Sequence, residues 1–109
     1  MDSPENVLAR IYQTLLERKD ADPQSSYTAS LYARPDTLLK KIGEEAAETM
    51  IAAKNGDRAA LVHELADLWF HTLVLMADRG ITPADLTGEL GRRMGQSGHA
   101  EKASRTGKG

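Results

Sequence analysis

Five acidic residues in two neighbouring segments have the types and spacing that bind a metal ion. Glu44, Glu45 and Glu48 lie in one segment. Glu64 and Asp67 lie in the next. At about 100° per residue on a helix, Glu45 and Glu48 share one face, and the second pair repeats their spacing. Each segment, if helical, therefore presents two carboxylates side by side.

The residue between the two segments predicts that these pairs meet. Gly56 suits a left-handed helix end, and a tight turn there makes the flanking helices antiparallel. Glu48 and Glu64 are equally far from Gly56 in the sequence, and the same holds for Glu45 and Asp67. With a rise of about 1.5 Å per residue, the two pairs should lie at matching heights, roughly 12 and 16 Å from the turn.

The four carboxylates flank the apolar seam of the predicted helices instead of facing solvent. Mutual repulsion and desolvation make such packing unfavourable unless a cation compensates it. An all-oxygen set favours Mg²⁺, with Mn²⁺ as a substitute, over zinc or copper. Each acid taken singly is explained equally well as an ordinary surface charge, but the matched set is not. A di-iron carboxylate bundle would need a Glu-x-x-His pair, which the sequence lacks.

Cationic and imidazole side chains near the acids could contact a phosphorylated ligand. Lys41 precedes Glu45 by one helical turn, although a surface ion pair explains it as well. His71 follows Asp67 by one turn, where it could orient a ligand or touch substrate. A hydrogen-bonded histidine at the edge of the core is the simpler interpretation. Arg34 could also contact phosphate, but a lone arginine is weak support.

Ser26, Tyr27 and Thr28 lie in a segment rich in turn-forming residues, where loops often carry binding contacts. Their hydroxyl groups and aromatic ring could contact ribose, phosphate or base. From the residues alone, a helix cap and a partly buried tyrosine are the favoured interpretation of this cluster.

Apolar residues recur at helical spacing through the body of the chain, and no segment alternates with a period of two. This predicts an all-α fold, an antiparallel helical hairpin or bundle of about four main helices, with Trp69 and the methionines in the core. The predicted helices span residues 4–18, 35–55, 58–79 and 83–94, with one helical turn around residues 28–32. A two-sided apolar stripe predicts that a homodimer completes the bundle. Residues 95–109, rich in glycine, serine and lysine, are expected to form a disordered tail after a single domain at 1–94.

The amino-acid composition indicates which classes of binding partner and metal site to expect. The 109 residues carry a net charge of −2 and no cysteine, which gives no indication of disulfides, thiolate metal sites or a cysteine nucleophile. Acidic and basic residues are intermixed, which argues against a nucleic-acid surface. There is no signal-peptide pattern, and no apolar stretch is expected to reach membrane-spanning length. A cytoplasmic protein without a membrane partner is predicted.

Three longer stretches of the sequence are SYTASL at 26–31, KKIGEEAAE at 40–48 and AAKNGDRAALVHELADLWFH at 52–71. Together they closely resemble the phosphoribosyl-ATP pyrophosphatases of histidine biosynthesis, within the MazG-like all-α nucleotide pyrophosphohydrolase superfamily. The resemblance implies Mg²⁺-dependent hydrolysis of 1-(5-phosphoribosyl)-ATP to phosphoribosyl-AMP and pyrophosphate, the second step of the pathway.

The resemblance also implies roles for particular residues, all within the segments quoted above. The implied metal ligands are Glu45, Glu48, Glu64 and Asp67, with Glu44 either as an additional ligand or as a residue that supports the ligands. For that reaction we expect Glu45 or Glu48 to be the catalytic base, and Ser26, Tyr27, Thr28, Lys41 and His71 to contact substrate. Two alternatives stay open: a house-cleaning nucleoside triphosphate pyrophosphohydrolase of the same superfamily, and a non-enzymatic helical interaction module. Metal-dependent turnover would exclude the second.

Overall fold

A computed structural model describes residues 3–95, which form helices and no strand, and confirms the all-α prediction. Of the predicted disordered tail, 95–109, only Gly95 lies within the described residues. The elements in chain order are α1 (Pro4–Glu17), a 3₁₀ turn η1 (Arg18–Asp20), α2 (Tyr27–Ala33), α3 (Pro35–Asn55), α4 (Arg58–Arg79) and α5 (Pro83–Met94).

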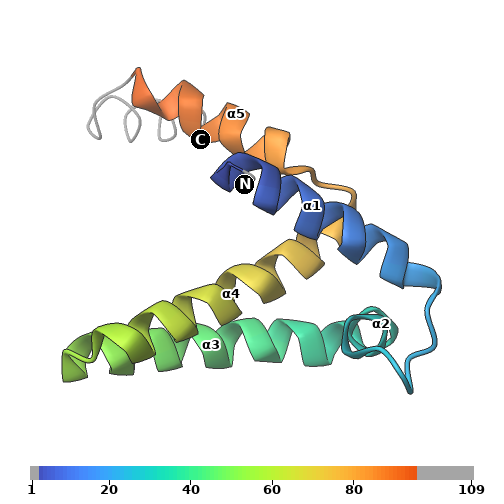
Figure 1. The fold of residues 1–109 in the computed structure, drawn as a ribbon, viewed down its shortest axis with the longest axis horizontal. Helices are drawn as coiled ribbons and strands as arrows, with labels where there is room; N and C mark the ends of the chain where they lie inside the picture. The colour runs from blue at the N-terminus through green and yellow to red at the C-terminus, as the bar shows by residue number, and fades with distance from the viewer. Residues whose placement is uncertain (1–2, 96–109) are drawn as a thin grey trace, which may run out of the picture.

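The two longest helices, α3 and α4, form an antiparallel hairpin and pack against each other (Figure 1). Gly56 ends α3 with φ of 71°, a backbone conformation that side chains with a Cβ rarely adopt. Asp57 then caps α4, because its side chain accepts a hydrogen bond of 3.0 Å from the Ala60 amide. The turn therefore has the residues and the geometry that the sequence predicted.

The remaining helices cover one end of this hairpin, with α1 packed across α4 and α5 against α1 (Figure 1). Gly80 ends α4 with φ of 72°, and Thr82 and Asp85 form a reciprocal capping box at the start of α5. The core joins α1, α2, α3 and α4. Its buried members are Tyr12, Leu15, Leu31, Leu38, Leu73, Val74, Met76 and Ala77.

Helix α2 is longer than the single turn expected around residues 28–32. Ser26 caps it by accepting a hydrogen bond of 3.2 Å from the Ala29 amide, and the helix runs for seven residues. Its outer end is fixed because the Tyr32 hydroxyl donates a 2.7 Å hydrogen bond to the Leu15 carbonyl of α1. These tertiary contacts stabilise a helix too short to be evident from periodicity.

Two further expectations are wrong for α4. An 18-residue window of this helix reaches a mean hydropathy of 1.2, enough by length and composition for a membrane span. That is no sign of insertion, since Glu64 and Asp67 lie in the first half of the helix, and Val74 and Ala77 are fully buried in the core. Trp69, expected in the core, is 58% exposed. No other element of residues 3–95 fully covers its side of α4.

The methionines are also more exposed than predicted. Met76 is buried in the core, but Met50 and Met94 are exposed. Both lie on helix faces that no other described element covers. Their apolar character therefore did not correctly predict which residues form the core.

Replacing Gly43 within α3 and Gly56 at its end by alanine should change the free energy of unfolding in opposite directions. Gly56→Ala should lower the free energy of unfolding by about 1–2 kcal/mol, because alanine is strained at positive φ. Gly43→Ala should raise it by up to about 1 kcal/mol, because Gly43 lies mid-helix with nothing within 4 Å of the added carbon. Urea unfolding followed by circular dichroism measures both. Equal shifts of the same sign would contradict the described turn.

Candidate metal and active site

Three carboxylates converge across the hairpin. Glu45 and Glu48 of α3 and Glu64 of α4 each bring a carboxylate oxygen within 4.8 Å of the others. Glu45 is buried at 5% exposure, Glu64 is half-buried and Glu48 is exposed, so the cluster runs from the helix seam to solvent. The turn at Gly56 brings these acids of the two helices together, as their spacing in the sequence predicted.

Asp67 belongs to a second, overlapping group with His63 and Glu64. The Asp67 carboxylate lies 3.3 Å from His63 Nε2, one helical turn away on α4. Glu64 is common to both groups, whereas no group among the described residues contains both Glu45 and Asp67. His63 is not among the predicted site residues, although its four-residue spacing from Asp67 was a usable signal.

The electrostatics of the cluster indicate a missing positive partner. The Oε2 atoms of Glu45 and Glu64 are buried, and no donor in the described part of the chain reaches them. The pKa of Glu64 is raised to about 7, first because its protonated form can donate a hydrogen bond to Glu48. Burial and the neighbouring charge of Glu45 add to this rise. Protonation of Glu64 relieves the repulsion that a cation would otherwise remove.

The donor set fits a hard divalent cation. The first group offers carboxylate oxygens only, which suit Mg²⁺ or Mn²⁺ better than softer metals. A cation between α3 and α4 would give the two buried oxygens the partner that they lack. Glu45, Glu48 and Glu64 are therefore the residues best placed to hold it, with Asp67 beside Glu64.

Glu44, the fifth predicted acid, faces lysines and lies outside both acidic groups. Its Oε2 is 3.5 Å from Lys41 Nζ, and its Oε1 is 3.9 Å from Lys40 Nζ. Lys41 also lies 3.6 Å from Glu45 Oε1, so it bridges the two acids at the edge of the cluster. Partial burial lowers the pKa of Lys41, but Tyr27, Glu44 and Glu45 together raise it above its ordinary value. Lys41 therefore stays cationic.

A hydrogen-bonded chain joins α2 to α4 beside the acids. His71 is buried, and its Nδ1 lies 2.7 Å from the Asp67 carbonyl oxygen, so Nδ1 carries the donated hydrogen. In the neutral ring, Nε2 then accepts from the Tyr27 hydroxyl at 2.8 Å. The Tyr27 ring stacks on Phe70 with centroids 6.4 Å apart. The structure therefore fixes Tyr27 over the face of α4 that carries Asp67.

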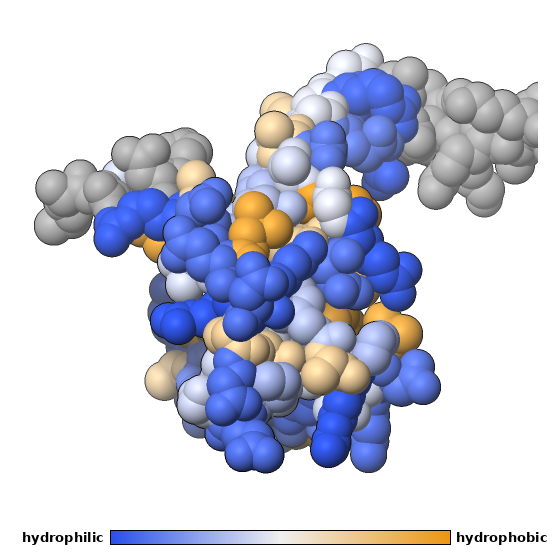
Figure 2. Space-filling view, turned by 90° about the vertical axis from the view of Figure 1, so that its right-hand side faces the viewer, coloured by the Kyte–Doolittle hydropathy of each residue, from blue (hydrophilic) through white to orange (hydrophobic). Residues whose placement is uncertain are grey.

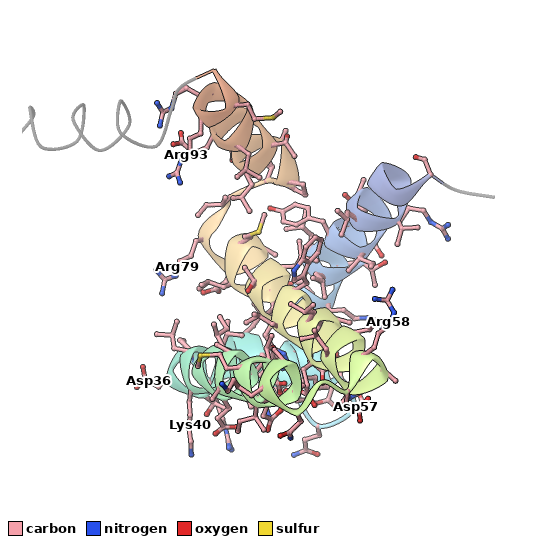
Figure 3. The ribbon with its side chains drawn as sticks, turned by 90° about the vertical axis from the view of Figure 1, so that its left-hand side faces the viewer. Asp36, Lys40, Asp57, Arg58, Arg79 and Arg93 are labelled. Carbon is pink, nitrogen blue, oxygen red and sulfur yellow. The ribbon has the colours of Figure 1, made fainter. Side chains whose placement is uncertain are left out.

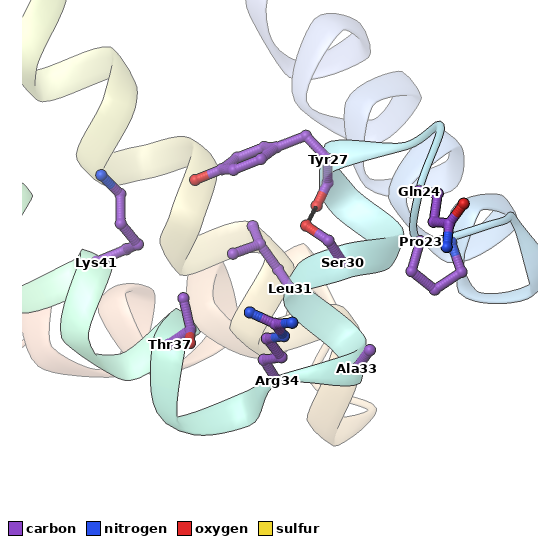
Figure 4. Close-up of a pocket in the computed structure, with 9 residues that line it drawn as sticks. All are labelled: Pro23, Gln24, Tyr27, Ser30, Leu31, Ala33, Arg34, Thr37 and Lys41. Carbon is purple, nitrogen blue, oxygen red and sulfur yellow. Dashed lines mark hydrogen bonds between the residues drawn. The ribbon is translucent and has the colours of Figure 1, made fainter.

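The three residues of the Ser26–Thr28 cluster separate in space. Ser26 is occupied as the cap of α2, and Thr28 is buried toward α1, in a different pocket from the one that Tyr27 lines. A pocket of about 440 Å³ lies beside Tyr27 and Lys41 (Figure 4). Ser30 also lines it and donates a 2.5 Å hydrogen bond to the Tyr27 carbonyl. The sequence pattern did not predict Ser30 as a site residue, because nothing in it distinguished the side of α2 on which Ser30 lies.

Known proteins identify the kind of molecule that carries this site. The family model for phosphoribosyl-ATP pyrophosphohydrolase matches residues 8–94. The chain belongs to this family. A phosphoribosyl-ATP pyrophosphatase from Geobacter sulfurreducens is 55% identical over 96% of this chain and 98% of its own length. One from Methylococcus capsulatus is 57% identical over 92% of this chain and 96% of its own length. One from Chromobacterium violaceum is 54% identical over 92% of this chain and 94% of its own length.

Membership of a pyrophosphohydrolase family agrees with the geometry. The matched residues 8–94 include both acidic groups, the Tyr27–His71 pair and Lys41. The chain spans nearly the whole length of these relatives. The resemblance drawn from the sequence motifs is confirmed, and the non-enzymatic helical module is excluded.

The raised pKa of Glu64 predicts how the stability of the metal-free protein depends on pH. The folded protein holds a proton up to about pH 7 that the unfolded chain releases near pH 4.5. Stability should therefore fall as pH rises through this window, and Mg²⁺ at pH 8 should restore it. Glu64→Gln should flatten this part of the profile in thermal unfolding with EDTA.

The matched control is Glu89→Gln on α5. Arg92 and Arg93 lower the pKa of Glu89 to about 2, so it stays ionised from pH 5 to 8 and the variant should keep the wild-type slope. A Glu64→Gln profile as steep as that of the wild type would show that Glu64 does not carry the effect.

Proposed function

We propose that this chain hydrolyses 1-(5-phosphoribosyl)-ATP to 1-(5-phosphoribosyl)-AMP and pyrophosphate, the second step of histidine biosynthesis, in the cytoplasm. The observation that carries the proposal is the cluster of Glu45, Glu48 and Glu64, whose buried oxygens lack a donor in the described chain. Relatives more than 50% identical over nearly the whole chain bear the name of this activity.

The proposed cofactor is Mg²⁺, with Mn²⁺ as a substitute, held by Glu45, Glu48, Glu64 and Asp67. Such a cation, when bound, neutralises charge on phosphate oxygens and favours attack by water. Glu44 stays a predicted ligand, but its contacts support a different role. Because Glu44 and Glu45 both face Lys41, they hold its ammonium group at the edge of the site, where a phosphate can reach it.

The proposed reaction adds one water across a phosphoanhydride bond. Glu48 is the better placed of the two predicted bases, because its carboxylate is exposed, whereas Glu45 is buried and paired with Lys41. Glu48 would take the proton from the attacking water as the pyrophosphate leaves. Lys41 would stabilise the charge of the phosphates, and the Tyr27 ring, held by His71 and Phe70, would form a wall for the nucleoside.

Pyrophosphate release from phosphoribosyl-ATP, ATP and dUTP, each with Mg²⁺ and with EDTA, tests this proposal. Only phosphoribosyl-ATP with Mg²⁺ should react rapidly. Glu48→Gln should lower kcat by at least about 100-fold with an unchanged helical circular dichroism spectrum, because the base is lost while the shape is kept. Glu17→Gln, an exposed position on α1, is the control.

Faster hydrolysis of ATP or dUTP would assign the chain to the house-cleaning class instead. Full activity of Glu48→Gln would remove Glu48 from the mechanism without affecting the substrate assignment.

We also propose that a second copy of the chain covers the apolar surface left open on one side of the molecule. A groove of about 410 Å³ between α1, α4 and α5 is lined by apolar side chains, including those of Trp69 and Leu90, each 58% exposed. Val62 and Leu65 extend this surface along α4. The opposite, α2 end of the molecule is mainly hydrophilic with small apolar areas (Figure 2). A homodimer through α4 and α5 would bury the apolar side.

Trp69→Glu should convert the dimer to a monomer in light scattering after gel filtration, because it places a charge on the proposed interface. The substitution lies outside the core, so the helices should persist. Lys40→Gln makes the same change in net charge on a side chain that projects from α3 away from α4 (Figure 3), and should leave the dimer intact. A Trp69→Glu protein that stays dimeric would place the interface elsewhere.

A further inference from the structure

The pocket beside the acidic cluster contains a second cationic position that the proposed hydrolysis does not use. Its cations are Arg34, at the start of α3, and Lys41, two turns further along the same helix (Figure 4). Ser30 of α2 and Thr37 of α3 add hydroxyl groups to the wall. The pocket therefore presents one basic residue near the carboxylates and another away from them.

The two cations differ in what already neutralises them. Lys41 lies within 4 Å of both Glu44 and Glu45. Arg34 is exposed, and no carboxylate of residues 3–95 pairs with it. Its guanidinium group points from the helix start toward Leu31 and Thr37, into the pocket (Figure 4). Arg34 is thus available for an anionic ligand, and a guanidinium group can bind phosphate oxygens through two parallel hydrogen bonds.

The position of Arg34 along α3 matches a ligand that carries phosphate at both ends. Glu45 follows Arg34 by 11 residues, which is about 16 Å of helix rise, with Lys41 between them. In phosphoribosyl-ATP the triphosphate must lie at the acidic cluster. The 5′-phosphate of the second ribose lies at the far end of the molecule, beyond the adenine ring. A phosphate monoester there carries nearly two negative charges at pH 7.

We propose that Arg34 binds the 5′-phosphate of the phosphoribosyl group, so that this pocket selects phosphoribosyl-ATP over plain nucleoside triphosphates. The proposal rests on the proposed function, since it assigns the second end of the same substrate. The adenine and second ribose would lie between Tyr27 and Thr37. ATP lacks the group that Arg34 binds, so it would occupy only the triphosphate end.

Steady-state kinetics of Arg34→Gln tests this assignment. The KM for phosphoribosyl-ATP should rise about 10- to 100-fold with kcat little changed, because a charged hydrogen-bonded contact is lost far from the reacting phosphate. Inhibition by ATP should keep its wild-type constant. Arg34→Lys, which keeps the charge without the paired donors, should recover part of the loss. Arg79→Gln removes the same kind of cation from the exposed end of α4 and should behave as wild type.

Ribose 5-phosphate provides a readout that does not depend on turnover. In NMR titrations of the wild-type protein it should shift amide signals of α2 and the first turns of α3. Ribose alone should not shift them, and neither sugar should shift them in Arg34→Gln. Shifts of equal size with both sugars would show that the pocket does not recognise the phosphate.

The two proposals fail in different ways. A wild-type protein that does not hydrolyse phosphoribosyl-ATP contradicts the proposed function itself. An active wild-type protein whose Arg34→Gln variant keeps its KM, or loses affinity for ATP as much as for phosphoribosyl-ATP, leaves that function standing and overturns the role of Arg34.

Discussion

The packing of three carboxylates into the seam between α3 and α4 is the constraint on which the structure depends. Glu45 is buried, and two oxygens of the cluster have no donor within the described chain. Carboxylates so close together repel one another and lose hydration, so the metal-free fold must keep them together by other means. That support comes from the packing of α3 against α4, from the fixed turn at Gly56 and from Lys41 beside Glu45.

Helix α4 shows how the chain meets this constraint. Its first half carries Glu64 and Asp67, and its second half supplies Leu73, Val74 and Ala77 to the core. A third side presents Trp69, which no element of the described residues fully covers. One helix thus serves the site, the core and an open apolar surface, and this explains why its hydropathy reaches the range of a membrane span.

Local rules predicted the helix ends well, because each signal acts within a few residues. Gly56 and Gly80 do adopt positive φ, and Asp57 and Thr82 do cap the helices that follow them. The convergence of Glu45, Glu48 and Glu64 followed from counting along two helices joined by one turn. What the sequence missed depends on tertiary contacts: the length of α2 and the exposure of Trp69. Periodicity marks which face is apolar, but it does not tell whether the same chain or another covers that face.

The hairpin arrangement also bears on how the chain folds. All three acids of the cluster lie within the 20 residues from Glu45 to Glu64, which a single short turn brings together. Contacts between neighbouring helices have low contact order, and closing so short a loop costs little chain entropy. The acidic residues should therefore come together early in folding, before α1 and α5 have docked. The most repulsive part of the molecule would then form with little help from the core, and a divalent cation bound by these acids, as proposed above, would act on the folding pathway as well as on the finished protein.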